Sequence, residues 1–288
     1  MNLDKRLKGL SLKVGPLGES DRLLTILSDK EGVIRLAIPG ARKPKSSLAA
    51  AAPLTFLDLH IVGRRGLPRV KQMKIIRSFS NLGKQIETLA AAQALTELIL
   101  LLVANNDPQP SLLKTVLIHL ERLEEIANKP KNQILVLAKV IQACIHLLAL
   151  GGYCIPLQTC SRSGMILEPP LGQWEWRCSL IPEEGFVIGS IPNAIIQLNP
   201  SELALLQRLL QPNLPVKKNL ELMGPIEAWL KLLTVIECWI EHHLPKNLRS
   251  LQMLREVIII PNLSSDGLNN LDIHYGTATN TKDLSTNN

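Results

Sequence analysis

Apolar residues recur with two different periods along the chain, and the first period is that of strands. Over the first 80 residues, short apolar runs alternate with polar positions and are separated by turns rich in Gly, Pro and Asp. Ile34, Leu36 and Ile38, for example, would lie on one face of a strand. The pattern predicts five strands, at residues 10–14, 23–28, 33–38, 57–61 and 70–76. Short, evenly spaced strands of this kind are typical of a small β-barrel.

From about residue 81 the apolar period becomes that of helices. Helices are predicted at 82–103, 111–127, 132–150, 201–210 and 225–244, with Ser111 and Ser201 as candidate N-caps and Gly151 and Gly152 ending the third helix. Residues 153–189 read as an irregular insertion, and 261–288, rich in Asn, Ser and Thr, as a disordered tail. The predicted fold class is therefore α+β and multidomain: a β-barrel domain at 1–80, an all-α helical domain at 81–260 that contains the insertion, and the tail.

Composition adds that the core is aliphatic and the location intracellular. Apolar residues make up 46% of the chain but aromatic ones only 3%, so Leu, Ile, Val and Ala must fill the core. The longest apolar run, 98–104, is too short to cross a bilayer, and the N-terminus lacks the apolar segment of a secretory signal. The five cysteines are then expected as free thiols in a reducing cytoplasm.

Positive charge is concentrated at one end of the chain. Residues 1–80 hold sixteen Lys and Arg against six Asp and Glu, whereas the remainder holds sixteen against nineteen. Clustered positive charge on one domain is the electrostatic signature of a polyanion-binding protein, with nucleic acid the commonest target. The alternative is that these side chains only keep a small barrel soluble.

The basic residues of the predicted barrel form two clusters and one outlier. The first cluster follows the third strand, the second surrounds the turn before the last strand, and the outlier lies on the non-core face of the third strand. Two residues of the second cluster, Arg69 and Lys71, are two positions apart and would project from one face of a strand. Contacts with phosphates would be salt-sensitive and would carry little sequence preference. The candidate DNA-binding residues are Arg35, Arg42, Lys43, Lys45, Arg64, Arg65, Arg69 and Lys71.

Neither a metal site nor an active site is indicated. Cys160 and Cys178 lack partners at C-x2-C spacing, because Ser163 and Ile181 occupy those positions, so we expect no zinc and no other cofactor. Cys238 lies four residues before His242 at the end of a predicted helix, where packing or capping is the expected role. The chain contains no H-E-x-x-H, Walker, G-x-S-x-G or G-x-G-x-x-G motif, which argues against an enzyme.

Several strings of the sequence resemble the RecO family of bacterial recombination mediators. They are GESDRLLTILS at 18–28 with Glu31-Gly32, PGARKPKS at 39–46, LGGYCIPL at 150–157 with Cys160, and HLPKNLRSL at 243–251. They occur in the family's order and together span about residues 10 to 255. The resemblance implies an N-terminal OB-fold, binding of single- and double-stranded DNA, annealing of complementary strands, and no chemical step. It also implies a cytoplasmic, nucleoid-associated protein that works with RecR and single-stranded DNA-binding protein to load RecA.

One departure from the family concerns the insertion. Many members carry two C-x2-C pairs there, whereas this chain keeps only Cys160 and Cys178. We interpret the insertion as a degenerate zinc finger that is held instead by packing of Trp174, Trp176 and Phe186.

Two alternatives and one undecided assignment remain at this stage. The alternatives are an OB-fold RNA- or single-stranded-DNA-binding adaptor of another pathway with a helical interaction domain, and an adaptor that binds through its acidic helical domain. The residues that contact RecR, the oligomeric state and the role of the tail are not indicated. For the acidic tail of single-stranded DNA-binding protein, the sequence does not discriminate between Arg122, Lys131, Lys139 and Arg249.

Overall fold

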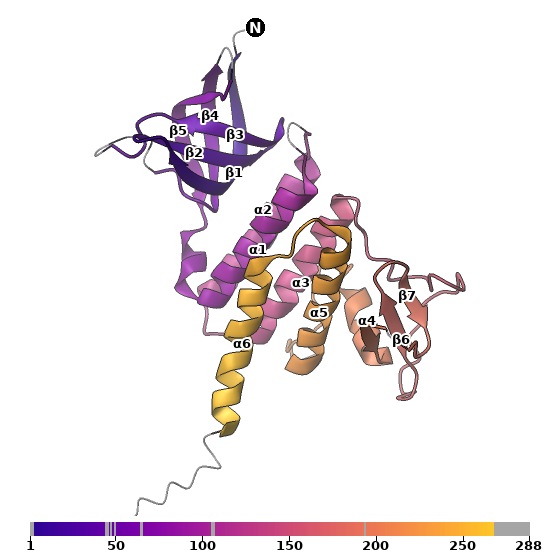
Figure 1. Cartoon of the computed structure of the whole chain (residues 1–288). Coiled ribbons are helices and arrows are strands. Elements are labelled where there is room, and N and C mark those ends of the chain that lie inside the picture. The colour runs from indigo at the N-terminus through magenta and orange to yellow at the C-terminus, as the bar shows by residue number, and fades with distance from the viewer. Residues whose placement is uncertain are drawn as a thin grey trace, which may run out of the picture.

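The N-terminal part of the chain is a closed five-stranded barrel (Figure 1). The computed structural model describes residues 3–43, 46, 48, 50–63, 66–104, 107–192 and 194–267. The strands are β1 (Leu3–Leu17), β2 (Asp21–Ser28), β3 (Gly32–Ile38), β4 (Thr55–Gly63) and β5 (Arg69–Ser78), in the order β1-β2-β3-β5-β4. Only the β3–β5 pair is parallel, and it is short. This is the strand order of an OB-fold, so the predicted barrel and its five strands are confirmed.

Alternation along the strands fills the barrel. In β4, Leu57, Leu59 and Ile61 are buried while Asp58 and His60 face outward, as the period of two requires. The inward residues of the other strands complete a small aliphatic core, which includes Leu7, Leu24, Ile26, Leu36, Ile38 and Val70.

The second part of the chain is a helical domain below the barrel in Figure 1. It comprises a short 3-10 turn (Ser80–Lys84) and α1 (Ile86–Leu102), α2 (Pro110–Ala127), α3 (Gln133–Leu150), α4 (Pro200–Arg208), α5 (Ile226–His243) and α6 (Arg249–Gly267). Helix α6 was not predicted; it packs on α1 through Leu251, Leu254 and Ile258 and extends past residue 260. Residues 268–288, most of the predicted tail, lie outside the described residues.

Helix α3 is the apolar centre of the helical domain. With a mean hydropathy of 1.9 over 18 residues, it is long and apolar enough to cross a membrane by length and composition alone. In the fold it is packed by α1, α2 and α5, and its side chains from Val136 to Leu148 are mostly buried. It is therefore a core helix of the helical domain.

Both predicted N-caps are wrong. Helix α2 begins at Pro110, so Ser111 already lies inside its first turn. Helix α4 is capped by Asn199 rather than Ser201: the Asn199 side chain accepts the Glu202 N–H at 2.9 Å, and the Glu202 carboxylate accepts the Asn199 N–H at 2.8 Å. This reciprocal capping box satisfies two N–H groups, and Pro200 fits the first helical position because that position needs no donor.

The insertion between α3 and α4 was predicted to be irregular, but it contains a three-stranded antiparallel sheet. Its strands are β6 (Cys178–Ile181), β7 (Gly185–Ile188) and β8 (Ile196–Leu198), in the order β7-β6-β8. Phe186 is buried and Trp176 packs on the core, as expected, but Trp174 is 68% exposed and cannot hold the loop. The end of α5 also contributes, since His243 Nε2 lies 2.9 Å from the Pro182 carbonyl oxygen in the β6–β7 turn.

A second hydrophobic core joins the barrel to the helices. Leu10, Leu12, Leu27 and Val33 of the barrel belong to the same buried cluster as α1, α2 and α3. At the edge of this junction, Arg77 of β5 contacts Glu121 at 2.5 Å and Glu124 at 3.1 Å on α2, and its guanidinium lies 4.8 Å from the centre of the Phe79 ring. The barrel is therefore fixed on the helices.

Candidate nucleic-acid interface

The first basic surface is formed by loops at one end of the barrel strands, and we call it the loop end. It is formed by the β1–β2 turn (18–20), the segment after β3 (39–43) and the start of β5. Asp21 organises it: its Oδ1 accepts the Gly40 N–H at 2.8 Å and the Ser20 hydroxyl at 3.0 Å. Gly40 adopts φ +62°, a left-handed conformation that suits glycine and turns the chain toward Asp21.

Three predicted residues converge on the loop end. The Arg42 N–H donates to the Ser20 carbonyl at 2.9 Å, and its guanidinium donates to the Gly18 carbonyl at 3.0 Å. The pKa of Asp21 is lowered chiefly by the Gly40 N–H and the Ser20 hydroxyl, and further by the nearby charges of Arg69 and Lys43. Arg42, Lys43 and Arg69 are all exposed, so their charges remain available to a ligand.

The other predicted residues divide into three groups. Lys45, Arg64 and Arg65 lie outside the described residues. Arg35 is exposed on β3, two positions before Ala37, the residue that faces Arg69 across the strand pair. Lys71 is displaced from Arg69 by a β-bulge: Ile61 pairs with Val70 but His60 pairs with Gln72, which leaves Lys71 as the extra residue. Arg69 and Lys71 are nevertheless both exposed and Val70 between them is buried, so both side chains lie on the outside of the barrel.

Lys71 belongs to a second basic surface that the sequence reasoning missed. It lies near Asp4, whose pKa is lowered first by the hydrogen bond from His60 at 2.5 Å and then, despite opposing desolvation, by the charges of His60 and Lys71. Across β1, β4 and β5, outward residues form two rows: Lys8, Asp58 and Lys74, and Arg6, His60 and Gln72. We call this surface, including Asp4 and Lys71, the ladder face. Its basic residues could have been found by extending the first strand before Leu10.

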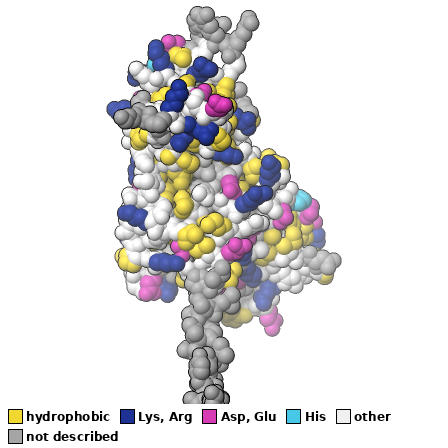
Figure 2. All heavy atoms as spheres, turned by 60° about the vertical axis from the view of Figure 1, so that its left-hand side comes forward, with side chains coloured by type: hydrophobic (Ala, Val, Ile, Leu, Met, Phe, Trp, Pro, Cys, Tyr) yellow, Lys and Arg dark blue, Asp and Glu magenta, His cyan; other side chains and the backbone are white. Residues whose placement is uncertain are grey.

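The two basic surfaces lie on a barrel rich in positive charge. Figure 2 shows Lys and Arg side chains gathered over the barrel, in the upper part of the molecule, with few acidic side chains among them. Apolar side chains are visible instead near the junction with the helices. Positive charge of this density can bind a phosphate backbone.

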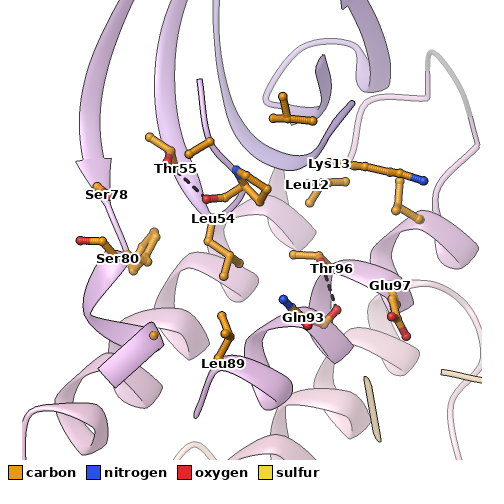
Figure 3. Close-up of a pocket in the computed structure, with 16 residues that line it drawn as sticks. Leu12, Lys13, Leu54, Thr55, Ser78, Ser80, Leu89, Gln93, Thr96 and Glu97 are labelled. Carbon is orange, nitrogen blue, oxygen red and sulfur yellow. Dashed lines mark hydrogen bonds between the residues drawn. The ribbon is translucent and has the colours of Figure 1, made fainter. Parts of the chain in front are cut away.

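The junction itself contains a cavity of about 610 Å³ (Figure 3). Its walls include Leu12, Leu54 and Phe79, with Leu89 and Leu100 from α1. Its polar groups are engaged locally: the Thr96 hydroxyl donates to the Gln93 carbonyl at 2.8 Å and the Thr55 hydroxyl to the Pro53 carbonyl at 3.4 Å. Glu97 accepts the Ser250 hydroxyl of α6 at 2.8 Å. The lining groups that the structure describes thus stabilise the junction and do not form a nucleophile–base pair.

The cysteines of the insertion do not form a metal cluster. The Cys160 thiol accepts the Ile188 N–H at 3.4 Å, and Cys178 faces Ile188 from the neighbouring strand. Burial opposes ionisation of Cys160, but hydrogen bonds from the Ser163 side chain and from backbone N–H groups outweigh it and lower its pKa to about 7. Within the described ranges, no group of three or more His, Cys, Asp or Glu could hold a metal ion.

The four basic residues considered for binding an acidic protein tail lie in different environments. Lys131 forms an ion pair with the buried carboxylate of Glu87. Arg122 and Lys139 lie close together on α2 and α3, and the pKa of Lys139 is lowered by burial and by the charge of Arg122. Arg249 is the first residue of α6.

Comparison with known proteins now places the chain. Residues 1–79 match the model for the N-terminal part of recombination protein O, and residues 83–252 match the model for its C-terminal part. The DNA repair protein RecO of Prochlorococcus marinus (strain MIT 9303) is 66% identical over 260 residues, which cover 90% of this chain and 97% of that protein. That of Synechococcus sp. (strain WH7803) is 60% identical over 265 residues, or 92% and 98% of the two chains. The RecO of Nostoc sp. (strain PCC 7120) is 29% identical, with 88% and 96% covered. The chain belongs to the RecO family of DNA repair proteins, which are recombination mediators rather than enzymes.

Proposed function

We propose that this recombination mediator binds single- and double-stranded DNA through phosphate contacts at the loop end of its barrel and anneals complementary strands. The observation that carries the proposal is the convergence of Arg42, Lys43 and Arg69 around Asp21. Two strands repel each other until cations screen their phosphates, so a basic surface is what annealing requires. Arg35, Lys45, Arg64 and Arg65 are proposed to extend the same contacts, and Lys71 is proposed to bind phosphate from the neighbouring ladder face.

Base stacking is expected to contribute little to this binding. The first 80 residues contain only two aromatic residues, Phe56 and Phe79. Phe79 is buried and Phe56 is half-buried against the helical core. Without exposed aromatic platforms, phosphate charge must supply most of the affinity, which makes binding strongly dependent on salt.

The helical domain, residues 81–260, is proposed as the half that binds protein partners. Working with RecR, the protein would help load RecA onto strands coated by single-stranded DNA-binding protein, in the bacterial cytoplasm at the nucleoid. For an acidic protein tail, Arg122 and Lys139 are better placed than Lys131, because the Lys131 ammonium is already paired with Glu87. Binding an anion stabilises two adjacent, partly desolvated cations more than it stabilises one cation that already has an ion-pair partner.

The test of the loop end is a salt titration of DNA binding by the full chain. The triple variant R42E/K43E/R69E is compared with K114E/K129E/K218E, which makes the same change in net charge at exposed positions of the helical domain. The first variant should bind a single-stranded oligonucleotide more weakly, and the slope of log K against log salt should fall by about 2, since each lost phosphate contact removes about 0.7. Equal losses in both variants, or no loss in the first, would refute the proposed site.

Annealing and partner binding are tested separately with the same proteins. Annealing of complementary oligonucleotides, bare or coated with single-stranded DNA-binding protein, should slow in the loop-end variant and not in the control. An R122E/K139E variant should lose capture of the acidic tail peptide while retaining DNA affinity. If it retains the peptide, the tail binds elsewhere.

A further inference from the structure

The ladder face has the residues of a DNA-binding surface distinct from the loop end. Arg6, Lys8 and Lys74 are exposed on the outside of β1 and β5, because the residues between them in the β1 alternation, such as Leu7, point into the barrel core. The acidic residues on this face are partly neutralised. Asp58 lies between Lys8 and Lys74 in register, and Asp4 is bonded to His60.

The spacing of these cations suits a nucleic-acid strand. Alternate residues of one strand are about 6.7 Å apart, so Arg6 and Lys8 are separated by about two stacked nucleotides at 3.4 Å each. Lys8 and Lys74 are separated by one intervening strand, or about 10 Å. Their charges thus form a two-dimensional array.

The array is far enough from the loop end to act separately. Arg69 belongs to the loop end and pairs with Val62, whereas Lys74 belongs to the ladder face and pairs with Asp58, and four residues of β4 extend over about 13 Å. This exceeds the screening length of about 10 Å at 0.1 M salt. Phosphates held at the two surfaces would therefore repel each other only weakly. Lys71, two residues from Arg69 on β5, lies at the border between the two surfaces.

We propose that the ladder face binds a second strand of DNA while the loop end holds the first, so that a single barrel can bring two strands together. This inference rests on the proposed function, since it assumes that the loop end binds DNA. The occupant is a single strand of DNA held by its phosphates, because the face presents Arg6, Lys8, Lys71 and Lys74 against two acidic residues. A protein partner on the same face is an outcome that the test can reveal, given that Ile75 and Ile76 beside Lys74 are 43% and 44% exposed.

The experiment measures retention of a second strand by protein already bound to a first one. A biotinylated oligo-dT is immobilised sparsely and loaded with full-length protein, unbound protein is washed away, and a fluorescent oligo-dT that cannot pair with the first is added. The ladder variant R6Q/K8Q/K74Q is compared with wild type, with the loop-end variant and with K114Q/K129Q/K218Q, which removes the same charge from the helical domain. Circular dichroism and thermal unfolding establish that each variant is folded.

The expected result is a separation of the two steps. The ladder variant should bind the first strand within about threefold of wild type but lose retention of the second by about tenfold or more, because three phosphate contacts are removed from one site only. The rate of annealing should fall with the second-strand retention, and the control should match wild type in each assay.

Three outcomes would overturn the inference. In the first, the ladder variant retains the second strand normally. In the second, it loses first-strand affinity as severely as the loop-end variant, which would indicate one continuous site. In the third, it loses only capture of RecR, which would indicate a protein-binding surface. Failure of the proposed function is distinguishable, because it appears as normal first-strand binding by the loop-end variant.

Discussion

The buried His119 and the half-buried His146 predict that the fold loses stability below about pH 6.5. His146 Nε2 lies 2.9 Å from the Leu209 carbonyl oxygen, so it must carry the proton and donate. His146 Nδ1 is then an acceptor, and His119 Nε2, 3.1 Å away, donates to it. This leaves His119 Nδ1 unprotonated, buried and without a hydrogen-bond partner among the described residues. Any added proton on His119 would go to that nitrogen.

The size of the effect follows from the pKa of His119. Burial, and then repulsion by His146, Arg122 and Lys139, lower the pKa of His119 from 6.5 to about 3. The unfolded chain therefore takes up a proton first, and stability is intact above pH 6.5 and lost as the pH falls below it. Between pH 7.5 and 5.0, His119 alone should lower the free energy of unfolding by about 2 kcal/mol. His146 adds in the same direction, since burial also lowers its pKa.

Urea unfolding at pH 7.5 and 5.0, followed by circular dichroism, measures this loss. In H119Q, the amide nitrogen of glutamine can still donate to His146 but cannot be protonated, so the loss between the two pH values should be smaller by about 2 kcal/mol. H242Q is the matched control, because the His242 side chain is 37% exposed. If wild type and H119Q lose the same free energy between pH 7.5 and 5.0, the argument from the buried Nδ1 is wrong.

Three further predictions concern the junction between barrel and helices. Arg77→Ala should lower the free energy of unfolding by about 2 kcal/mol in urea titrations, because the Glu124 side chain, only 8% exposed, loses its cation, whereas Lys74→Ala should have little effect. Gly32→Ala should cost about 3 kcal/mol, because Gly32 has φ +66° and a Cβ would lie 2.0 Å from the Asp107 carbonyl oxygen. Gly66→Ala, at φ +78° with open space around it, should cost only about 1 kcal/mol; equal costs would contradict the contact. The fragment 1–80 should associate or unfold in analytical ultracentrifugation, since it exposes Leu10, Leu12, Leu27 and Val33; a stable monomer would contradict a shared core.

The sequence predicts the barrel well because its core depends on local alternation. All five strands were located, but β1 begins seven residues earlier than predicted. In that part of β1 the inward positions are Lys5, Leu7 and Gly9, of which only Leu7 is apolar, and Lys5 is paired with Glu31 at 2.5 Å. Strand pairing with β4, rather than hydrophobicity, stabilises this segment. Pairing partners far apart in sequence cannot be inferred from a local pattern.

Helix α6 shows a similar limit. Leu251, Leu254 and Ile258 have helical spacing, but their burial depends on α1, some 150 residues earlier in the chain. The same holds for the caps, because Asn199 and Ser201 are equally acceptable N-cap residues and the choice depends on where Pro200 and the β8–α4 turn place the first helical residue.

Charge counting correctly located the basic end of the chain, but it could not divide the sixteen basic residues among surfaces. That division depends on strand register: the early start of β1 brings Arg6 and Lys8 opposite His60 and Asp58 on the ladder face. Some basic side chains already form ion pairs within the protein and are less available to phosphates, as Arg77 does with Glu121 and Glu124. A count of Lys and Arg is therefore an upper bound on the charges available to DNA.

The shared core gives this division a physical consequence for annealing. Because the barrel is packed on α1 and α2 through its own strands, the loop end and the ladder face keep a fixed relation to each other and to the helical domain. Strands bound at two fixed sites have already lost much of their translational freedom, so their encounter becomes effectively intramolecular, with a gain set by the separation of the sites. A flexible tether between barrel and helices would leave the loop end and the ladder face unchanged. Partners bound to the helical domain would then no longer keep a fixed position relative to these two surfaces. Loosening the junction with Arg77→Ala should thus slow annealing on strands coated by single-stranded DNA-binding protein more than annealing of bare strands, and equal slowing would show that the junction has no part in delivering DNA.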